Sequence, residues 1–302
     1  MGATLYVVHD TKPARGRFTN LIILLILGFL WGSSYLFIKI AVGEVPTLTL
    51  VAGRLLVATV LMWGLLLITR QSLPRSRALW GSYAVVGLLS GVVPYSLVAW
   101  SEQFIPSSLA SLLQATLPLF TVVLAHFMIA DERLQSRRIL GVLVGFVGVA
   151  LLMLPALQSG VRGSILGQLA MVASSISYAL STIYARNRLR DQPPLVTATG
   201  QFTMGLLFIL PLVLILETPF HLSLSWAVVG SWLGLTVFGT ILAYILYYAL
   251  IARASATFVS TVTYIIPVNG LLLGALVLDE PLSLMLFLSL GLILLGVLLV
   301  RK

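Results

Sequence analysis

The sequence contains no cysteine and very few charged residues. Charged side chains account for 9% of the 302 residues and hydrophobic ones for 59%, whereas a typical soluble protein has roughly 25% charged residues. Because so few charges cannot cover the surface of a soluble fold of this length, the chain is predicted to lie in a lipid bilayer. The missing cysteines exclude disulfides, thiolate nucleophiles, cysteine-ligated zinc and iron–sulfur clusters.

Motifs for catalysis and nucleotide binding are missing as well. The sequence has no G-x-x-x-x-G-K-[ST] phosphate loop, no H-E-x-x-H zinc motif and no Ser–His arrangement typical of a membrane protease. Its three histidines, His9, His126 and His221, lie too far apart to predict a metal cluster. The sequence therefore predicts a protein that is not an enzyme and that uses no cofactor and no metal.

Apolar spans follow one another along the chain with short links between them. Each span is long enough to cross roughly 30 Å of hydrocarbon as a helix. We therefore expect an all-α integral membrane protein with ten transmembrane helices. The spans are 20–42, 47–69, 79–100, 108–130, 138–157, 163–184, 195–216, 225–250, 254–278 and 281–300.

The basic residues predict the orientation of these spans. If the N-terminal tail, residues 1–19, is cytoplasmic and the spans alternate, 15 of the 18 Lys and Arg residues fall in cytoplasmic segments and only Arg162 falls on the opposite side. Because Lys and Arg collect in cytoplasmic loops, we expect a multi-pass protein of the cell membrane with both termini cytoplasmic. The net charge of +9 then reflects these loops, and no nucleic acid partner is expected.

The two halves of the chain match at an offset of 149 residues. Each half, 20–157 and 163–300, holds five spans, and because five is odd the second half enters the membrane from the opposite side. Such inverted repeats are typical of secondary transporters, which bind substrate near the midplane between the repeats. An old duplication kept only for folding is the alternative. The matched pairs include Tyr35 with Tyr184, Tyr95 with Tyr244, Ser111 with Ser260, and Pro118 with Pro267.

Two matched spans carry a stripe of small and polar residues with a central proline. Proline removes one backbone hydrogen bond, which here leaves the carbonyls of Gln114 and Thr263 without their usual donor. Pro118 and Pro267 are therefore predicted to act in gating, and tight helix packing is the alternative. The stripes, at steps of three and four residues, are Ser107, Ser111, Gln114, Pro118 and Thr121, and Ala256, Ser260, Thr263, Pro267 and Gly270.

Two cations lie inside the spans, whereas the carboxylates lie at span ends or in links. Arg54, roughly 10 Å deep by helical rise, should face the bundle interior, where it either anchors an anionic substrate group or locks helices together. Lys39, near a span end, either serves as an anion anchor or snorkels to the interface. Because a deep carboxylate is the usual partner of a cation, its absence favours neutral, zwitterionic or anionic cargo.

Several motifs together resemble the EamA-type carriers of the drug/metabolite transporter superfamily. The resemblance covers nearly the whole chain, and it implies a ten-helix carrier of the inner membrane that often exports amino acids or other metabolites. The motifs are Trp31-Gly32-Ser33-Ser34-Tyr35 with Lys39; Pro46 with Arg54; Pro118, Asp131-Glu132-Arg133, Gly141 and Gly148; and Pro267, Asp279-Glu280, Gly291 and Gly296.

The polar and aromatic faces predict a substrate site at mid-depth between the two halves. Aromatic rings offer flat apolar walls with polar tips, and an amide or hydroxyl can orient a ligand. The alternative is that the tyrosines belong to core packing or to the interfacial belt. The predicted substrate-binding residues are Trp31, Tyr35, Arg54, Tyr95, Gln114, Tyr184, Tyr244, Tyr248 and Thr263, with Lys39 as a further anion anchor.

The predicted function is a secondary transporter that moves small metabolites by alternating access. Amino acids or related zwitterions are the leading cargo, and the direction, export, is implied by the resemblance alone. A channel or scaffolding subunit, or a membrane-embedded enzyme acting on lipids, is the alternative. The expected partners are a small-molecule substrate and the lipid bilayer, and four G-x-x-x-G runs, which allow close helix approach, leave a homodimer open.

Overall fold

The computed structural model describes residues 14–129, 135–217, 224–251, 253–254 and 256–301. Within these ranges the chain forms helices and no strand, so the prediction of an all-helical fold is confirmed for the described residues. Nine helical segments of the described chain are long and apolar enough to cross a membrane, and Leu284–Val300 is a shorter apolar helix. The count of ten membrane helices therefore stays a prediction.

The helices of the first half end in a long helix at one edge of the molecule. In chain order they are α1 (Ala14–Ala41), α2 (Thr47–Ile68), α3 (Arg77–Gly87), η1 (Leu88–Val92), α4 (Val93–Ser101), α5 (Ser107–Gln114), α6 (Leu117–Met128) and α7 (Ser136–Ser159).

The second half has a similar succession of elements. They are α8 (Arg162–Arg188), α9 (Pro194–Leu216), α10 (Trp226–Thr236), η3 (Val237–Leu242), α11 (Ala243–Ile251), α12 (Ala256–Ser260), α13 (Val262–Leu278) and α14 (Leu284–Arg301).

A π-helical turn interrupts one membrane span in each half. The two turns, η1 and η3, begin at Leu88 and Val237, which are 149 residues apart. Pro94, the second residue of α4 after η1, supplies no backbone N–H to the ladder, whereas η3 contains Gly239 and Thr240 and no proline. Single π turns inside α-helices occur frequently at functional sites, and both turns here lie in spans that reach the central cavity described below.

A second pair of spans is broken at a threonine. Ala115 and Thr116 separate α5 from α6, and Thr261 separates α12 from α13. The hydroxyl of each threonine donates to the carbonyl three residues earlier, at 2.6 Å. Pro118 is the second residue of α6, where a missing N–H costs little. Pro267 lies inside α13. The sequence pattern predicted equivalent kinks at the two prolines, but the prolines occupy different positions in their helices.

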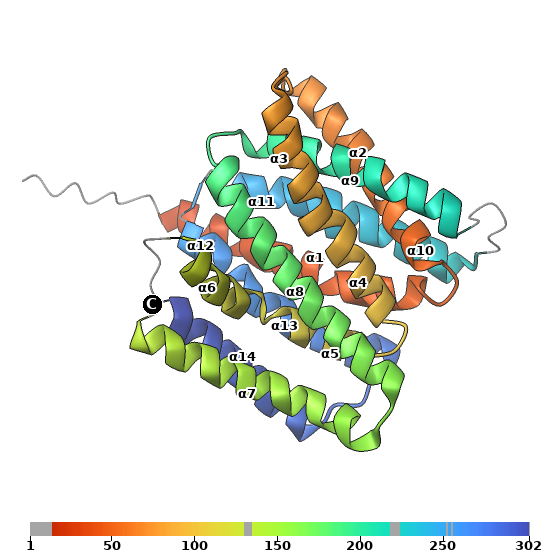
Figure 1. The fold of residues 1–302 in the computed structure, drawn as a ribbon, viewed down its shortest axis with the longest axis vertical. Coiled ribbons are helices and arrows are strands. Elements are labelled where there is room, and N and C mark those ends of the chain that lie inside the picture. The colour runs from red at the N-terminus through yellow and green to blue at the C-terminus, as the bar shows by residue number, and fades with distance from the viewer. Residues whose placement is uncertain (1–13, 130–134, 218–223, 252, 255, 302) are drawn as a thin grey trace, which may run out of the picture.

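Glycines bring helices of this one chain into backbone contact. The helices α7 and α14 lie side by side at one edge of the molecule, with α2 and α3 toward the opposite edge (Figure 1). A Cβ on Gly141 would lie 2.7 Å from the carbonyl oxygen of Gly296, and a Cβ on Gly296 would lie 2.6 Å from that of Gly141. The G-x-x-x-G run at 141–145 thus packs α7 against α14 within the chain.

Candidate functional site

The helices surround a cavity of about 340 Å³ near the middle of the bundle. Its walls come from both halves of the chain, from α1, α2, α4, α5, α6, α8, α11 and α13. A volume of this order lies at the lower end of the range for small-molecule sites. The lining residues are Trp31, Ser34, Tyr35, Ile38, Arg54, Tyr95, Val98, Gln114, Leu117, Tyr178, Thr182, Tyr244, Tyr247, Thr263 and Ile266.

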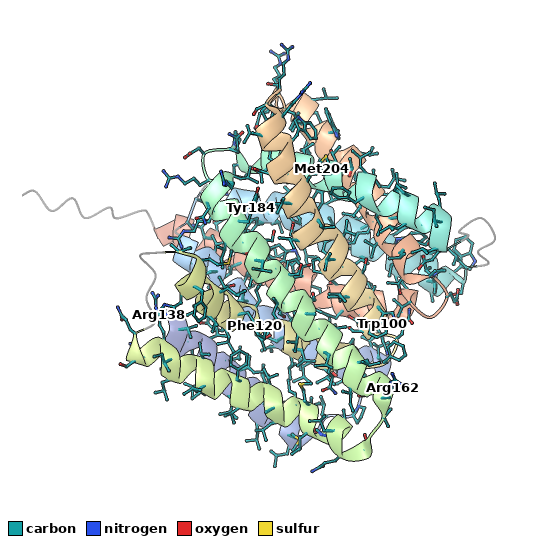
Figure 2. The ribbon with its side chains drawn as sticks, in the orientation of Figure 1. Trp100, Phe120, Arg138, Arg162, Tyr184 and Met204 are labelled. Atoms are coloured by element: carbon teal, nitrogen blue, oxygen red, sulfur yellow. The ribbon has the colours of Figure 1, made fainter. Side chains whose placement is uncertain are left out.

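Most of the predicted site residues lie on this lining, and one lies elsewhere. The side chain of Tyr184 points to a different cluster, where its hydroxyl is 3.4 Å from that of Ser82 on α3. Figure 2 shows Tyr184 at one end of α8, with Arg162 at the other end. The side chain of Tyr248 lies outside the described residues. The predicted residues on the lining are Trp31, Tyr35, Arg54, Tyr95, Gln114, Tyr244 and Thr263.

The sequence analysis missed Tyr178, Thr182 and Tyr247, which also line the cavity. Tyr178 and Thr182 follow Ser174 in steps of four residues, so a helical stripe along this span would have found them. The offset match with Tyr35 favoured Tyr184 instead, which lies on another face of the same helix.

Arg54 is the charged side chain of the described lining, and it is 8% exposed. Its Nε donates to the Thr240 hydroxyl in η3 at 2.8 Å, and its guanidinium carbon lies 3.9 Å from the centroid of the Tyr95 ring. In the described part of the chain, no hydrogen bond or carboxylate pairs with its two Nη nitrogens. A buried guanidinium carries donors that need partners, so the Nη groups of Arg54 can donate hydrogen bonds to an anion in the cavity.

Aromatic rings form much of the lining that Arg54 shares. The Trp31 ring centroid lies 6.3 Å from that of Tyr244 and 5.5 Å from that of Tyr247. The Tyr95 and Tyr178 centroids are 6.5 Å apart. These separations lie in the range in which aromatic pairs attract each other, and the ring faces offer surface for apolar groups and cations.

Gln114 supplies a second unused donor at the cavity. The Ser174 hydroxyl donates to Gln114 Oε1 at 3.3 Å, whereas Gln114 Nε2 is buried and has no hydrogen-bond partner among the described residues. Buried polar atoms are nearly always paired in folded proteins. Together with Arg54, this amide gives the cavity donors suited to an oxygen-bearing, negatively charged group.

Lys39 lies outside the cavity lining. Its ammonium donates to the carbonyl oxygens of Glu102 and Ile105, at 2.9 Å for the latter. These carbonyls belong to the end of α4 and the link that follows it, where helical carbonyls have no partner within the helix. The structure therefore places Lys39 on a helix end, at one end of the bundle.

Three carboxylates near Lys39 cap helix N-termini across the two halves. Glu217 accepts from the backbone N–H groups of Leu48 and Thr49 at 2.9 and 2.7 Å, at the start of α2. Glu44 accepts from the Ser225 N–H at 2.7 Å, before α10. Acidic groups at helix N-termini satisfy free N–H groups and the helix dipole.

The third carboxylate, Glu280, follows α13 and caps α5. It accepts from the backbone N–H groups of Ser107 and Ser108 at 2.7 and 2.9 Å, and from the Ser107 hydroxyl at 2.9 Å. We call the end of the bundle that holds Glu44, Glu217 and Glu280 the capped end. Each of these bonds joins one half of the chain to the other.

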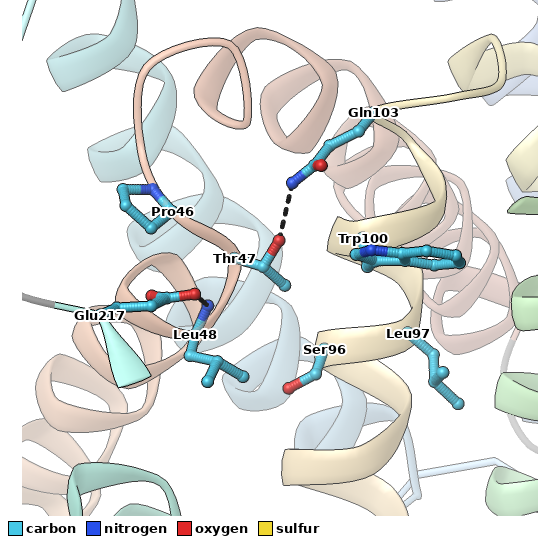
Figure 3. A pocket seen from close by; sticks show the side chains of 8 residues that line it. All are labelled: Pro46, Thr47, Leu48, Ser96, Leu97, Trp100, Gln103 and Glu217. Carbon is cyan, nitrogen blue, oxygen red and sulfur yellow. Dashed lines mark hydrogen bonds between the residues drawn. The ribbon is translucent and has the colours of Figure 1, made fainter. Parts of the chain in front are cut away.

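A side pocket of about 510 Å³ also lies at the capped end. Figure 3 shows two hydrogen bonds at this pocket. The Gln103 amide donates to the Thr47 hydroxyl at 2.8 Å, and the Leu48 N–H donates to Glu217. These bonds tie the start of α2 to the end of α4 and to α9.

The fold and its central cavity define a membrane transporter, and comparison with known proteins gives its family. The EamA-like transporter family matches residues 19–154 and 165–302, so the chain belongs to this family and the resemblance seen in the sequence is confirmed. It is 31% identical over 279 residues to the uncharacterized inner membrane transporter YedA of Escherichia coli strain K12, covering 91% of this chain and 88% of that protein.

Two further comparisons concern function and fold. A probable amino-acid metabolite efflux pump of Salmonella typhimurium is 26% identical over 268 residues, covering 86% of this chain and 87% of that protein. A protein crystal structure with 21% sequence identity superposes with a TM-score of 0.65, covering 93% of this chain and 96% of the other. The second comparison supports the fold alone.

Proposed function

We propose that this transporter carries amino acids or related carboxylate-bearing metabolites out of the cell by alternating access. The observation that carries the proposal is the buried Arg54 guanidinium on the cavity lining, whose Nη groups have no partner among the described residues. Guanidinium and carboxylate form paired, charge-assisted hydrogen bonds. The cavity therefore suits a ligand with one carboxylate and a body small enough for about 340 Å³.

The rest of an amino acid would contact the aromatic walls. An ammonium group can lie over the face of Trp31 or Tyr244, because aromatic faces attract cations, and an apolar side chain can pack on the same rings. Gln114 Nε2 offers a further donor to the carboxylate. In this arrangement the tyrosines and Trp31 recognise the substrate, and Arg54 fixes its orientation.

The proposal includes a transmembrane organisation of ten helices in two inverted repeats, with both termini cytoplasmic. The matched π turns, 149 residues apart, support two related halves, and the charge distribution supports the orientation. Under this organisation the capped end faces outward and the halves rock against each other near Pro118 and Pro267. Export is supported by the name of the Salmonella typhimurium relative.

The proposal is tested by counterflow in proteoliposomes with matched ligands. We would compare phenylalanine with phenylalaninamide and phenethylamine, which keep the ring and the ammonium but lack the carboxylate. The protein should transport the first and exclude the other two, with saturable kinetics. Flux that rises linearly with concentration would instead support a channel.

The role of Arg54 is tested with two substitutions and a surface control. Arg54→Gln should weaken binding of a carboxylate substrate at least about 30-fold, because losing one member of a buried charge pair costs about 2–5 kcal/mol and 1.4 kcal/mol is tenfold. Arg54→Lys keeps the charge but not the paired geometry, so its binding of the carboxylate substrate should lie between that of the parent protein and that of Arg54→Gln. Arg162→Gln, at the exposed start of α8, should transport normally. An Arg54→Gln variant that prefers phenylalanine over phenylalaninamide as strongly as the parent protein does would contradict the proposal.

A further inference from the structure

The buried carboxyl of Glu102 has no partner in the described structure. It follows α4 directly, it is 0% exposed, and neither of its two carboxylate oxygens has a hydrogen-bond partner among the described residues. The other carboxylates of the capped end all accept two or three hydrogen bonds or lie at the surface. Glu102 is thus the exception at an end of the molecule otherwise rich in paired carboxylates.

Other helices and links surround Glu102 and set its electrostatic environment. Lys39 of α1 and Glu280, which follows α13, act on it through their charges. Gly167 of α8 packs on the Ser101 carbonyl and Ile105 next to it and brings no charge.

The Lys39 ammonium does not neutralise this carboxyl by a direct bond. Its two hydrogen bonds go to the backbone carbonyls of Glu102 and Ile105. Burial raises the pKa of the Glu102 carboxyl well above its ordinary value, the Lys39 ammonium lowers that pKa, and the Glu280 carboxylate raises it. The closed arrangement seen here therefore favours the neutral carboxylic acid.

Opening of the capped end would reverse this preference. When α1 and α4 separate, water reaches the carboxyl and stabilises the ionised form, so the proton leaves. A carboxyl with a raised pKa in one state stabilises that state at low pH and loses the effect as the pH rises. Closure of the capped end therefore favours proton binding to Glu102, and proton binding favours closure.

We propose that Glu102 is a proton-binding site that controls the capped end, taking up one proton from water as this end closes and releasing it as this end opens. The proposal rests on the alternating-access function proposed above. It makes closure of the capped end depend on the proton concentration of the water at that end, and it places the proton site outside the substrate cavity. The carboxyl changes only between its neutral and ionised forms, and the proton comes from and returns to water.

The natural absence of cysteine allows a direct test without substrate. Ile38 lines the cavity and is 4% exposed, so an Ile38→Cys variant should react with a membrane-impermeant thiol reagent at the capped side only when that end opens. Ser159→Cys, exposed after α7, provides the reference for the reactivity of an accessible thiol at each pH. We expect the ratio of the two rates to rise at least fivefold between pH 5.5 and 8.5.

Variants of Glu102 test whether its carboxyl causes this pH dependence of labelling. In the Ile38→Cys background, Glu102→Gln imitates the protonated form, so labelling should be slow at every pH, and Glu102→Asp should keep the pH dependence. Glu44→Gln is the matched control, because the Ser225 N–H holds the pKa of the exposed Glu44 carboxyl below its ordinary value and outside this pH range.

Two outcomes overturn the proposal. The first is a rate ratio that does not change with pH in the chain that keeps Glu102, a result that needs no Glu102 variant to fold. The second is a Glu102→Gln variant whose pH profile equals that of the parent. Neither outcome depends on the cargo, so failure of the carboxylate panel and failure of the proton site are separate results.

Discussion

The two ends of the helix bundle are joined in different ways. At the capped end, Glu44, Glu217 and Glu280 each bond the N-terminus of a helix from the other half of the chain. The opposite end, formed by the links 70–76 and 189–193, carries exposed arginines. There the described structure shows a 3.4 Å contact between the Ser82 and Tyr184 hydroxyls and an apolar cluster that includes Leu66, Tyr83 and Leu189. The 3.4 Å pair between Arg190 and Asp191 joins adjacent residues of one link.

This difference indicates where the molecule is held closed. Hydrogen bonds to charged groups contribute more than neutral ones, whereas a pair as exposed as Arg190 and Asp191, at 77% and 85%, contributes little. A carrier that exposes its site alternately needs one end fixed while the other is free to part. Under the proposed alternating access, the structure therefore corresponds to a state that is closed at the capped end.

Labelling of single cysteines gives the largest effect and shows which end faces out. Ser159→Cys lies at the capped end and Ser72→Cys at the opposite end, and both positions are exposed. An impermeant thiol reagent added outside intact cells should label the first and spare the second completely. The reverse pattern would place the capped end in the cytoplasm and would refute the orientation proposed here.

Removal of one cap should loosen the capped end. Glu280→Ala leaves the N-terminal N–H groups of α5 without their acceptor, so the protein should lose about 2 kcal/mol of stability, as when a strong N-cap is removed. Thermal unfolding in detergent measures this loss. Asp279→Asn is the matched control, because Asp279 is exposed and adopts φ +53°, which asparagine tolerates. Equal losses in both variants would mean that the cap contributes nothing.

Alanine at the two prolines should affect transport unequally. Pro267 interrupts the hydrogen-bond ladder inside α13, whereas Pro118 stands at the start of α6. Pro267→Ala should therefore lower the transport rate several-fold with little change in cargo affinity, and Pro118→Ala should lower it less. Initial rates and binding measured on the same preparations check this order. Wild-type rates in both variants would assign the prolines to packing alone.

The smallest effect is expected at the opposite end. Asp191→Ala removes the Arg190 pair, and exposed pairs of this kind contribute about 0–1 kcal/mol. Unfolding in detergent should therefore be unchanged within about 0.5 kcal/mol. A loss as large as that of Glu280→Ala would show that the two ends are held equally and would remove the contrast.

Periodicity along single helices predicted much of the cavity. Arg54 and Tyr95 stand out because a cation or a tyrosine at mid-depth in an apolar helix needs an interior surface. The position of Lys39 was not predictable in the same way, since its acceptor carbonyls lie 63 and 66 residues further along the chain. The carboxylate caps also escaped prediction, because Glu280 bonds a helix 173 residues away.

Local pattern also failed to predict the helix irregularities. The turn η1 is followed by Pro94, which marks a disturbed ladder, but η3 has no such marker. Its clearest sign is the Thr240 hydroxyl, which donates to the carbonyl of Leu235, five residues earlier, at 3.3 Å. That bond depends on the turn already being formed, so the sequence alone did not reveal it.

Each π turn rotates the residues that follow it about the helix axis, relative to the residues before it. Each holds one residue more than an α-helical turn, and one residue corresponds to a rotation of about 100° about the helix axis. The turns thereby bring Tyr95 and Tyr244, which follow η1 and η3, onto the cavity face. Deleting one residue from either turn would thus leave the span nearly as long, yet would rotate its tyrosine away from Arg54.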